Sequence, residues 1–137
     1  MDIREEAKQF EEEAGVSLPE ALVMLYENKG NGGFGPEYGM LGIITGHKTD
    51  LGDSILSLYK TFCESDPEDP GWYWPRNLVP FIHVGCAIHY CVDLNNNNYP
   101  VIEFDPNGYG PGEELSNHFK QKQQSFNDWV NENCIKA

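Results

Sequence analysis

The chain has 137 residues, 39% of them hydrophobic and 12% aromatic, with 9 basic against 22 acidic residues and a net charge of −13. This length suits one compact domain over residues 1–137, and the apolar content excludes a disordered chain. The strong negative charge disfavours nucleic acid and anionic membranes as partners and favours basic ones.

Helical patterns dominate the first half of the chain. Apolar residues at helical spacing predict a first helix over 3–14, and a second helix holds Pro19 in its first turn and ends at Gly30. The residues after this helix predict a strand over 38–44. A third helix is then predicted over 50–64, ending before a proline-rich stretch.

Three β-rich runs follow in the second half of the chain. They cover Val79–Val84, Ala87–Asp93 and Pro100–Asp105, and turns at Gly85-Cys86 and Asn95–Asn98 separate them. Both connections are too short for a parallel crossover. We therefore predict an antiparallel meander at the centre of the sheet.

The C-terminal part combines a loop and a helix. Residues 108–124 are polar and glycine-rich, and we interpret them as an insertion, either partner-specific or merely a loop. The run Ser125-Phe126-Asn127-Asp128 has the spacing of a capping box and begins a short helix with an apolar face. The predicted fold class is therefore α+β, with N-terminal helices packed on a central, largely antiparallel sheet and a short C-terminal helix.

We expect no targeting segment at the start of the chain. The N-terminal residues are charged and lack the apolar run that a signal peptide or a membrane span requires. We therefore expect the protein in the cytoplasm. Its four cysteines are then expected as reduced thiols, because the cytosol opposes stable disulfides.

Four residues that can bind zinc lie within nine positions, namely His83, Cys86, His89 and Cys91. They contain no CxxC or HxxxH pair, and strand alternation separates Cys86 from His89 and Cys91. We therefore expect no metal and no cofactor. A hydrolase that uses the region of His83, Cys86 and Asp93, with the cysteine as nucleophile, stays open as an alternative.

Acidic residues mark the predicted strand ends. Asp93, Glu103 and Asp105 can form an acid pair or a metal site if those ends are adjacent, but acidic residues there are also common turn formers, which we favour. The run beginning at Asp93 resembles a calcium loop. Its sixth position, Asn98, is not the required glycine, and its twelfth, Phe104, is not a carboxylate, so calcium is excluded.

The loop after the third helix combines acids, prolines and aromatic residues. Trp72, Tyr73 and Trp74 lie beside the carboxylates of 66–69, a composition typical of an interface anchor. For each tryptophan we favour the alternative that it covers the edge of the core. No phosphate-binding glycine loop, GxSxG or HExxH motif occurs, and a basic stripe for nucleic acid is absent, so binding to another protein becomes the default function.

Short motifs follow one another in a definite order along nearly the whole chain. They are Gly15, Leu18-Pro19, Asn31-Gly32-Gly33, Trp74-Pro75, Leu78-Val79-Pro80-Phe81, Gly85-Cys86, Tyr90-Cys91-Val92-Asp93, Pro100-Val101-Ile102-Glu103-Phe104-Asp105 and Ser125-Phe126-Asn127-Asp128-Trp129. This ordered set resembles the SUKH superfamily, of the SMI/KNR type. The resemblance implies the same α+β fold that the periodicities predict.

The resemblance also implies a function. Bacterial members of this superfamily are mostly immunity proteins, which bind and neutralise polymorphic or contact-dependent toxins, often nucleases, and fungal relatives regulate the cell wall through protein contacts. It therefore implies a binding protein and not an enzyme, with a protein toxin, such as a basic nuclease, as partner. A regulatory scaffold domain without a toxin is the first alternative.

We expect the partner to bind an acidic face that carries two tyrosines as anchors. The charge, the aromatic loop and the resemblance together support this expectation, although solubility alone explains the charge equally well. The predicted partner-binding residues are Asp66, Glu68, Asp69, Tyr73, Asp93, Asp105 and Tyr109.

Overall fold

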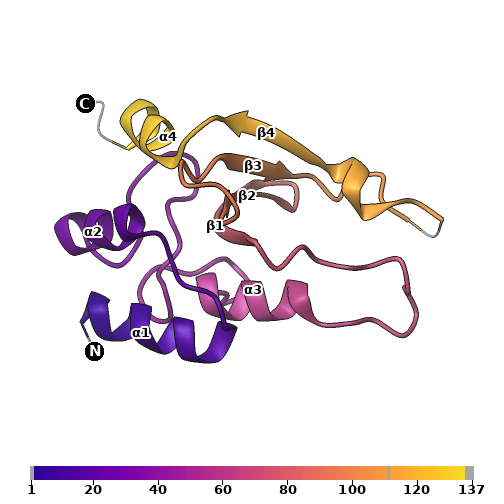
Figure 1. The fold of residues 1–137 in the computed structure, drawn as a ribbon, viewed down its shortest axis with the longest axis horizontal. Helices are drawn as coiled ribbons and strands as arrows, with labels where there is room; N and C mark the ends of the chain where they lie inside the picture. Colours follow the sequence, from indigo (N-terminus) through magenta and orange to yellow (C-terminus); the bar gives the residue numbers. More distant parts are fainter. Residues whose placement is uncertain (1, 111, 135–137) are drawn as a thin grey trace.

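The structure, a computed structural model, describes residues 2–110 and 112–134. Within them the chain forms α-helices, one 3-10 helix (η1) and one sheet (Figure 1). The elements are α1 (Ile3–Ala14), α2 (Glu20–Lys29), α3 (Ile55–Cys63), β1 (Leu78–Gly85), β2 (Ile88–Asp93), β3 (Val101–Phe104), η1 (Leu115–His118), β4 (Phe119–Gln123) and α4 (Phe126–Asn133). None of the helices in the described residues is long and apolar enough to cross a bilayer. The architecture is α+β, as predicted.

The sheet has four strands in the order β1-β2-β3-β4, and each neighbouring pair is antiparallel. The predicted meander of β1, β2 and β3 is confirmed. The stretch 108–124, interpreted as an insertion, contains η1 and also β4, which pairs with β3. Phe119 is the only apolar residue of β4, so the strand has no alternating pattern and is defined by its pairing with β3.

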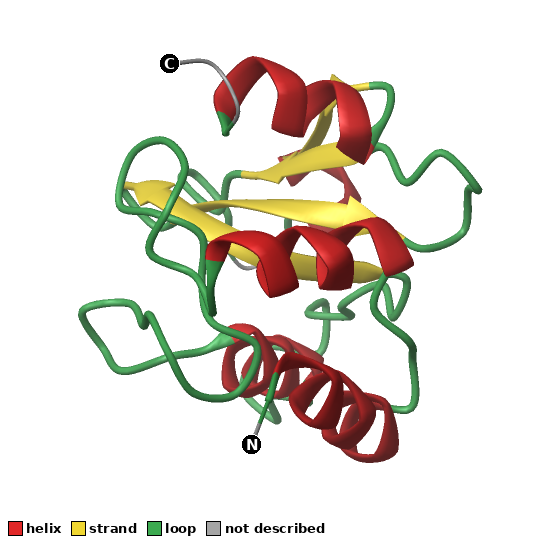
Figure 2. Ribbon diagram, turned by 90° about the vertical axis from the view of Figure 1, so that its left-hand side faces the viewer, coloured by secondary structure: helices red, strands yellow, loops and turns green. Residues whose placement is uncertain are grey.

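Helices cover both faces of the sheet. Tyr90 contacts Trp129 of α4 with ring centroids 6.3 Å apart, whereas the preceding residue, His89, contacts Phe62 of α3 at 5.4 Å. Because consecutive strand residues point to opposite faces, α4 and α3 pack on opposite sides. Figure 2 shows the helix beside the C-terminus and the helix beside the N-terminus with the strands between them.

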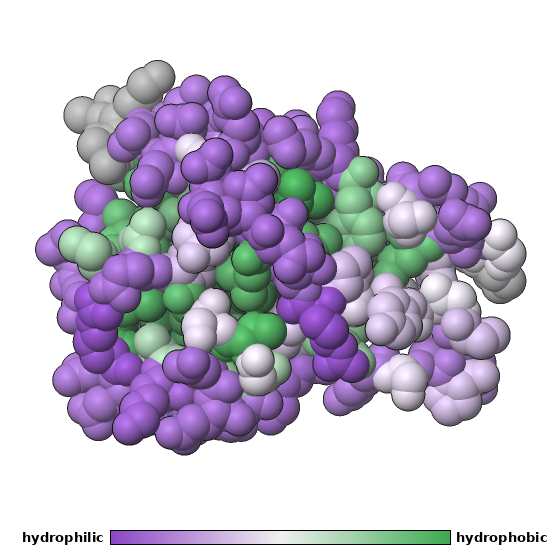
Figure 3. All heavy atoms as spheres, viewed as in Figure 1, coloured by the Kyte–Doolittle hydropathy of each residue, from purple (hydrophilic) through white to green (hydrophobic). Residues whose placement is uncertain are grey.

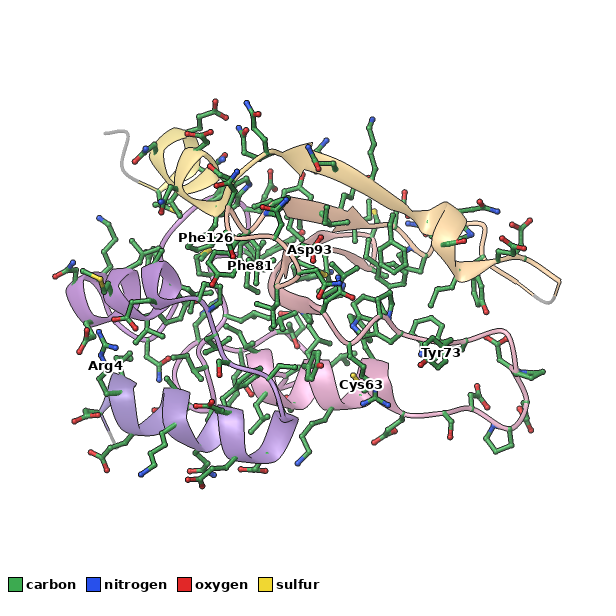
Figure 4. The ribbon with its side chains drawn as sticks, viewed as in Figure 1. Arg4, Cys63, Tyr73, Phe81, Asp93 and Phe126 are labelled. Carbon is green, nitrogen blue, oxygen red and sulfur yellow. The ribbon has the colours of Figure 1, made fainter. Side chains whose placement is uncertain are left out.

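The first two helices are joined by an ion-pair network. The Arg4 guanidinium lies between α1 and α2 (Figure 4), 2.6 Å from a carboxylate oxygen of Glu20 and 2.8 Å from one of Glu27. These carboxylates raise the pKa of Arg4 through hydrogen bonds. The groups are exposed, so the network orients the helices without contributing much stability.

The prediction of a strand over 38–44 is wrong. Within this stretch Met40 forms only an isolated bridge with Ile82. The chain reverses immediately afterwards at Gly42, where an added Cβ would lie 1.8 Å from the carbonyl oxygen of Thr45. Only glycine fits so close to another backbone segment, and the reversal prevents the strand from continuing.

The third helix begins later than predicted. Residues 50–54 precede it, and α3 starts at Ile55. Ser54 caps it, because its Oγ accepts from the backbone N–H of Ser57 at 3.3 Å. Gly52 has a φ of 86°, outside helical backbone, and Leu51, predicted on the buried face of the helix, is 91% exposed.

The hairpin between β1 and β2 turns through two residues other than glycine with positive φ. Cys86 has a φ of 54° and Ala87 a φ of 64°. Such a conformation costs an L-residue roughly 1–2 kcal/mol, and hairpins usually place Asn or Gly there. The Asn107 side chain donates to the Cys86 carbonyl at 2.8 Å, which helps to hold the turn.

Ala87→Gly is expected to raise the free energy of unfolding by about 1 kcal/mol, because glycine adopts this backbone without a steric penalty. Urea denaturation at neutral pH measures the change. The matched control is Ala7→Gly in the middle of α1, which is expected to lower the free energy by about 1 kcal/mol. A destabilised Ala87→Gly protein would contradict the interpretation of a strained turn.

Candidate protein-binding surface

An acidic segment, residues 64–75, connects α3 to β1 and projects from one end of the sheet (Figure 1). It contains four carboxylates, and its backbone is folded on itself. Asp66 and Asp69 form an isolated bridge, and the Asp66 side chain accepts from the backbone N–H of Glu68 at 2.9 Å. The segment therefore has a defined local structure, although it lies outside the helices and the sheet.

The three consecutive aromatic residues of this segment differ in exposure, and the rings of Trp72 and Trp74 stack with their centroids 6.2 Å apart. Trp74 is only 2% exposed and Trp72 is half-buried, whereas Tyr73 is 79% exposed. The Trp74 indole N–H donates to the Leu78 carbonyl at 2.8 Å, and that of Trp72 to the Phe62 carbonyl at 2.7 Å. The tryptophans thus attach the segment to the protein, and Tyr73 faces solvent (Figure 4).

A cluster of aromatic side chains packs against the tryptophans of the acidic segment. The Trp74 ring centroid lies 4.6 Å from that of Phe62, 4.9 Å from Phe104 and 5.4 Å from Phe119. Trp72 adds to it at 5.9 Å from Phe104. Residues of α3, β3 and β4 therefore fix the base of the segment through large buried rings.

A second loop, between β3 and η1, touches the acidic segment. The Tyr109 hydroxyl donates to Asp69 at 2.8 Å, and its ring lies 5.9 Å from that of Trp72. Partial desolvation, together with Asp69, raises the pKa of Tyr109. Asp105 begins this loop and accepts from the backbone N–H of Asn107 at 2.9 Å. Asp69, Asp105 and Tyr109 thus belong to one end of the molecule.

Asp93 lies elsewhere. It is the last residue of β2 and pairs with Leu78, at the end of the sheet opposite to Asp105. Because β2 and β3 are antiparallel, the acid pair considered from the sequence does not form. The Asp93 carboxylate accepts from the backbone N–H of Asn95 at 2.9 Å, so both aspartates are turn formers, the interpretation that the sequence favoured.

The carboxylates of the acidic segment have no basic counterpart. In residues 2–110 and 112–134, ion pairs join Arg4 to Glu20 and Glu27, Lys60 to Glu13 and Lys122 to Glu103, and the His118 ring lies 3.9 Å from the Glu113 carboxylate. None of these pairs involves residues 64–75. The negative charge of the segment is therefore uncompensated within the described part of the chain, and it faces solvent.

The structure separates Asp93 from His83 and Cys86, the other residues of the hydrolase alternative. The His83 and His89 rings are 4.8 Å apart, and burial, followed by the nearby His83, lowers the pKa of His89 to about 4. Cys86 is exposed on the hairpin, whereas burial raises the pKa of the Cys91 thiol. Asp93 lies at the far end of the β1–β2 ladder from His83. The described residues include no group of three or more His, Cys, Asp or Glu that could hold a metal ion.

The sequence comparison places these features in a family. A sequence model of the SMI1 / KNR4 family (SUKH-1) matches residues 4–132, from the first turn of α1 to within α4. The chain belongs to the SMI1 / KNR4 family. This SUKH-1 family is known for immunity-type proteins. No curated protein and no solved structure matches the chain.

Two residues of the SUKH-1 chain were not predicted from sequence as site residues: Phe62, in the last turn of α3, and Glu64, the first residue of the acidic segment. Together with Trp72 they line a hollow. Phe62 belonged to the apolar stripe of the predicted helix, which indicated only that it is buried. The signal that could have found Glu64 is its position directly before the acidic and proline-rich run.

Proposed function

We propose that this SUKH-1 chain is a single-domain immunity-type protein that binds and neutralises a protein toxin. The observation that carries the proposal is the acidic segment, whose carboxylates have no basic counterpart in the described residues and whose base is fixed by the indole hydrogen bonds of Trp72 and Trp74. A rigid, charged projection suits recognition of a protein better than catalysis. Family membership supports the same conclusion.

The proposed binding surface comprises the acidic segment and the adjoining loop between β3 and η1. Tyr73, exposed beside the carboxylates, is its aromatic anchor, and the Tyr109 hydrogen bond to Asp69 joins the two parts. Asp93 is left out because it lies at the opposite end of the sheet. The residues of the surface are Asp66, Glu68, Asp69, Tyr73, Asp105 and Tyr109.

The charge of the chain indicates how neutralisation works. A net charge of −13 attracts a basic protein over a distance and raises the rate of encounter. A nuclease binds its polyanionic substrate with a basic surface. We therefore propose that the toxin is a basic nuclease and that the acidic surface competes with its substrate, which requires contact but no catalytic residue.

Asp66→Lys combined with Glu68→Lys is expected to weaken toxin binding about 100-fold, roughly tenfold for each reversed charge. The test co-expresses the full chain with the protein encoded by the adjacent gene and measures growth rescue, co-purification and the dissociation constant. The control, Glu12→Lys with Asp50→Lys, makes the same charge change at exposed residues away from the surface.

Two outcomes would count against the proposal. If the Asp66 and Glu68 variant rescues growth as well as the wild type does, the interface lies outside the acidic segment. An adjacent gene product that neither inhibits growth nor binds the chain would instead favour a regulatory scaffold without a toxin.

A further inference from the structure

A hollow of about 520 Å³ opens between the end of α3 and the acidic segment. Two aromatic side chains, Phe62 and Trp72, line it together with the carboxylates of Glu64, Asp66 and Asp69. Figure 3 shows the end of the molecule from which the segment projects as paler, hence less hydrophilic, than the regions of α1 and α4. The hollow thus combines apolar rings with negative charge at the molecular surface.

The aromatic side chains that line the hollow are held in place. The Trp72 indole N–H is occupied by the Phe62 carbonyl at 2.7 Å, and the two ring centroids are 6.2 Å apart. Phe62 is in turn packed on Trp74 at 4.6 Å. With its N–H occupied, the indole offers a ligand only its apolar and π surface, and such a surface attracts cations.

The carboxylates of the hollow retain acceptor capacity. Asp69 accepts one hydrogen bond from the Tyr109 hydroxyl, and Glu64 and Asp66 are exposed. Two basic residues, Lys60 and Arg76, line a neighbouring hollow together with Glu64. Lys60 pairs with Glu13, Arg76 donates to the Cys63 carbonyl at 3.3 Å, and neither makes an ion pair with Glu64. A cation that entered the hollow would therefore meet carboxylates not already neutralised by the described residues.

We propose that the hollow binds one arginine side chain of the protein partner. Its guanidinium stacks on the aromatic lining and donates to the carboxylates of Glu64 and Asp66. A planar, delocalised cation makes both contacts at once, whereas the ammonium of lysine is compact and strongly hydrated. This inference rests on the proposed function, because it names the group through which that partner is recognised.

A second hollow on the protein can be compared with the proposed arginine site. This hollow, of about 520 Å³, lies on α1 and is lined by Glu5, Lys8, Gln9, Glu12 and Glu13. It is also acidic, but it has no aromatic residue and it includes a lysine. If negative charge alone attracted arginine, both hollows would bind it. The aromatic lining therefore distinguishes the proposed site from general electrostatic attraction.

The test uses the full-length protein, labelled with ¹⁵N, and two blocked tripeptides of known composition, Gly-Arg-Gly and Gly-citrulline-Gly. Citrulline keeps the shape of arginine and removes its charge. The arginine peptide is expected to shift the backbone signals of 61–72 and the Trp72 indole signal in a saturable way. The citrulline peptide is expected to bind about tenfold more weakly.

Variants locate the site. Glu64→Gln with Asp66→Asn is expected to weaken binding of the arginine peptide about threefold to tenfold, whereas Glu5→Gln with Glu12→Gln leaves it unchanged. All four side chains are exposed, so both variants are expected to fold. Equal binding of the two peptides, shifts centred on α1, or unchanged binding to the Glu64 and Asp66 variant would each overturn the inference.

The result can be separated from that of the toxin experiment. If growth rescue depends on the acidic segment but the arginine peptide does not bind there, the arginine site is wrong and the immunity function stands. If the peptide binds in the hollow but the adjacent gene product is not neutralised, the site stands and the proposed function fails.

Discussion

Glu6→Ala is expected to lower the free energy of unfolding by about 3–5 kcal/mol. The Glu6 carboxylate is 2% exposed and accepts hydrogen bonds from the backbone N–H groups of Ile44 and Thr45 at 2.9 and 2.8 Å. It also accepts from the Thr45 hydroxyl at 2.6 Å and the Asn31 amide at 3.0 Å. The alanine would leave these donors without their acceptor. Urea denaturation at neutral pH measures the loss.

An exposed glutamate on the same helix provides the control. Glu12→Ala is expected to change the free energy of unfolding by less than about 0.5 kcal/mol, because exposed side chains without partners contribute little. A comparable loss for the two variants would mean that α1 is sensitive to any substitution. The special role of Glu6 would then be refuted.

The effect of Glu6 is expected to depend on pH. Burial raises its pKa, but the hydrogen bonds from Thr45, Asn31 and Ile44 outweigh burial and lower the pKa below the usual 4.5. A carboxyl group whose pKa is lower in the folded state stabilises the folded protein. This contribution is complete at pH values above the unfolded-state pKa and is lost as the pH falls through the folded-state pKa. The free energies of unfolding of the wild type and of Glu6→Ala should therefore become more similar as the pH falls below about 4.5. A constant difference down to about pH 3 would contradict this.

Trp74→Ala is the second substitution with a large expected effect, a loss of about 3–5 kcal/mol. The indole is buried among Phe62, Phe104 and Phe119, so its removal leaves a cavity where α3, β3 and β4 meet. It also leaves the Leu78 carbonyl without its donor. Denaturant unfolding, with near-ultraviolet circular dichroism to report on the aromatic cluster, measures the change.

The neighbouring residue makes a sharp control for Trp74. Tyr73→Ala removes an aromatic side chain of the same segment that is 79% exposed, and it is expected to cost less than about 1 kcal/mol. It should nevertheless weaken toxin binding if Tyr73 is an anchor. Similar losses of stability for the two alanine variants would contradict the assigned orientations of these rings.

Most of the fold could be predicted because its elements carry their own periodicity. The helices α1 and α2 each present an apolar stripe, and the strands of the meander are short runs of residues with strand preference separated by turns. The strand β4 carries none, since its pairing with β3 decides its conformation. The strand predicted over 38–44 does not form, although its residues have strand preference. The close backbone contact at Gly42 forces the chain to reverse there.

The candidate surface was predicted in composition and in the placement of its tryptophans. The prediction that Trp72 and Trp74 cover the edge of the core is confirmed. The hydrogen bonds that orient the two indoles could not be predicted, because their carbonyl acceptors are brought to them by the fold. The buried, hydrogen-bonded position of Glu6 could not be predicted from the sequence at all. It is one of several glutamates on α1, and its partners come from positions 31, 44 and 45. Long-range hydrogen bonding of this kind has no local pattern.

The hydrogen bond between Tyr109 and Asp69 connects positions 40 residues apart. Exposed loops rich in proline and acids are ordinarily where proteases cut, because cleavage requires a segment that can leave its folded conformation. Here that bond and the two indole N–H groups oppose such local opening. The acidic segment is thus already ordered before a partner binds, so it loses little conformational entropy on binding.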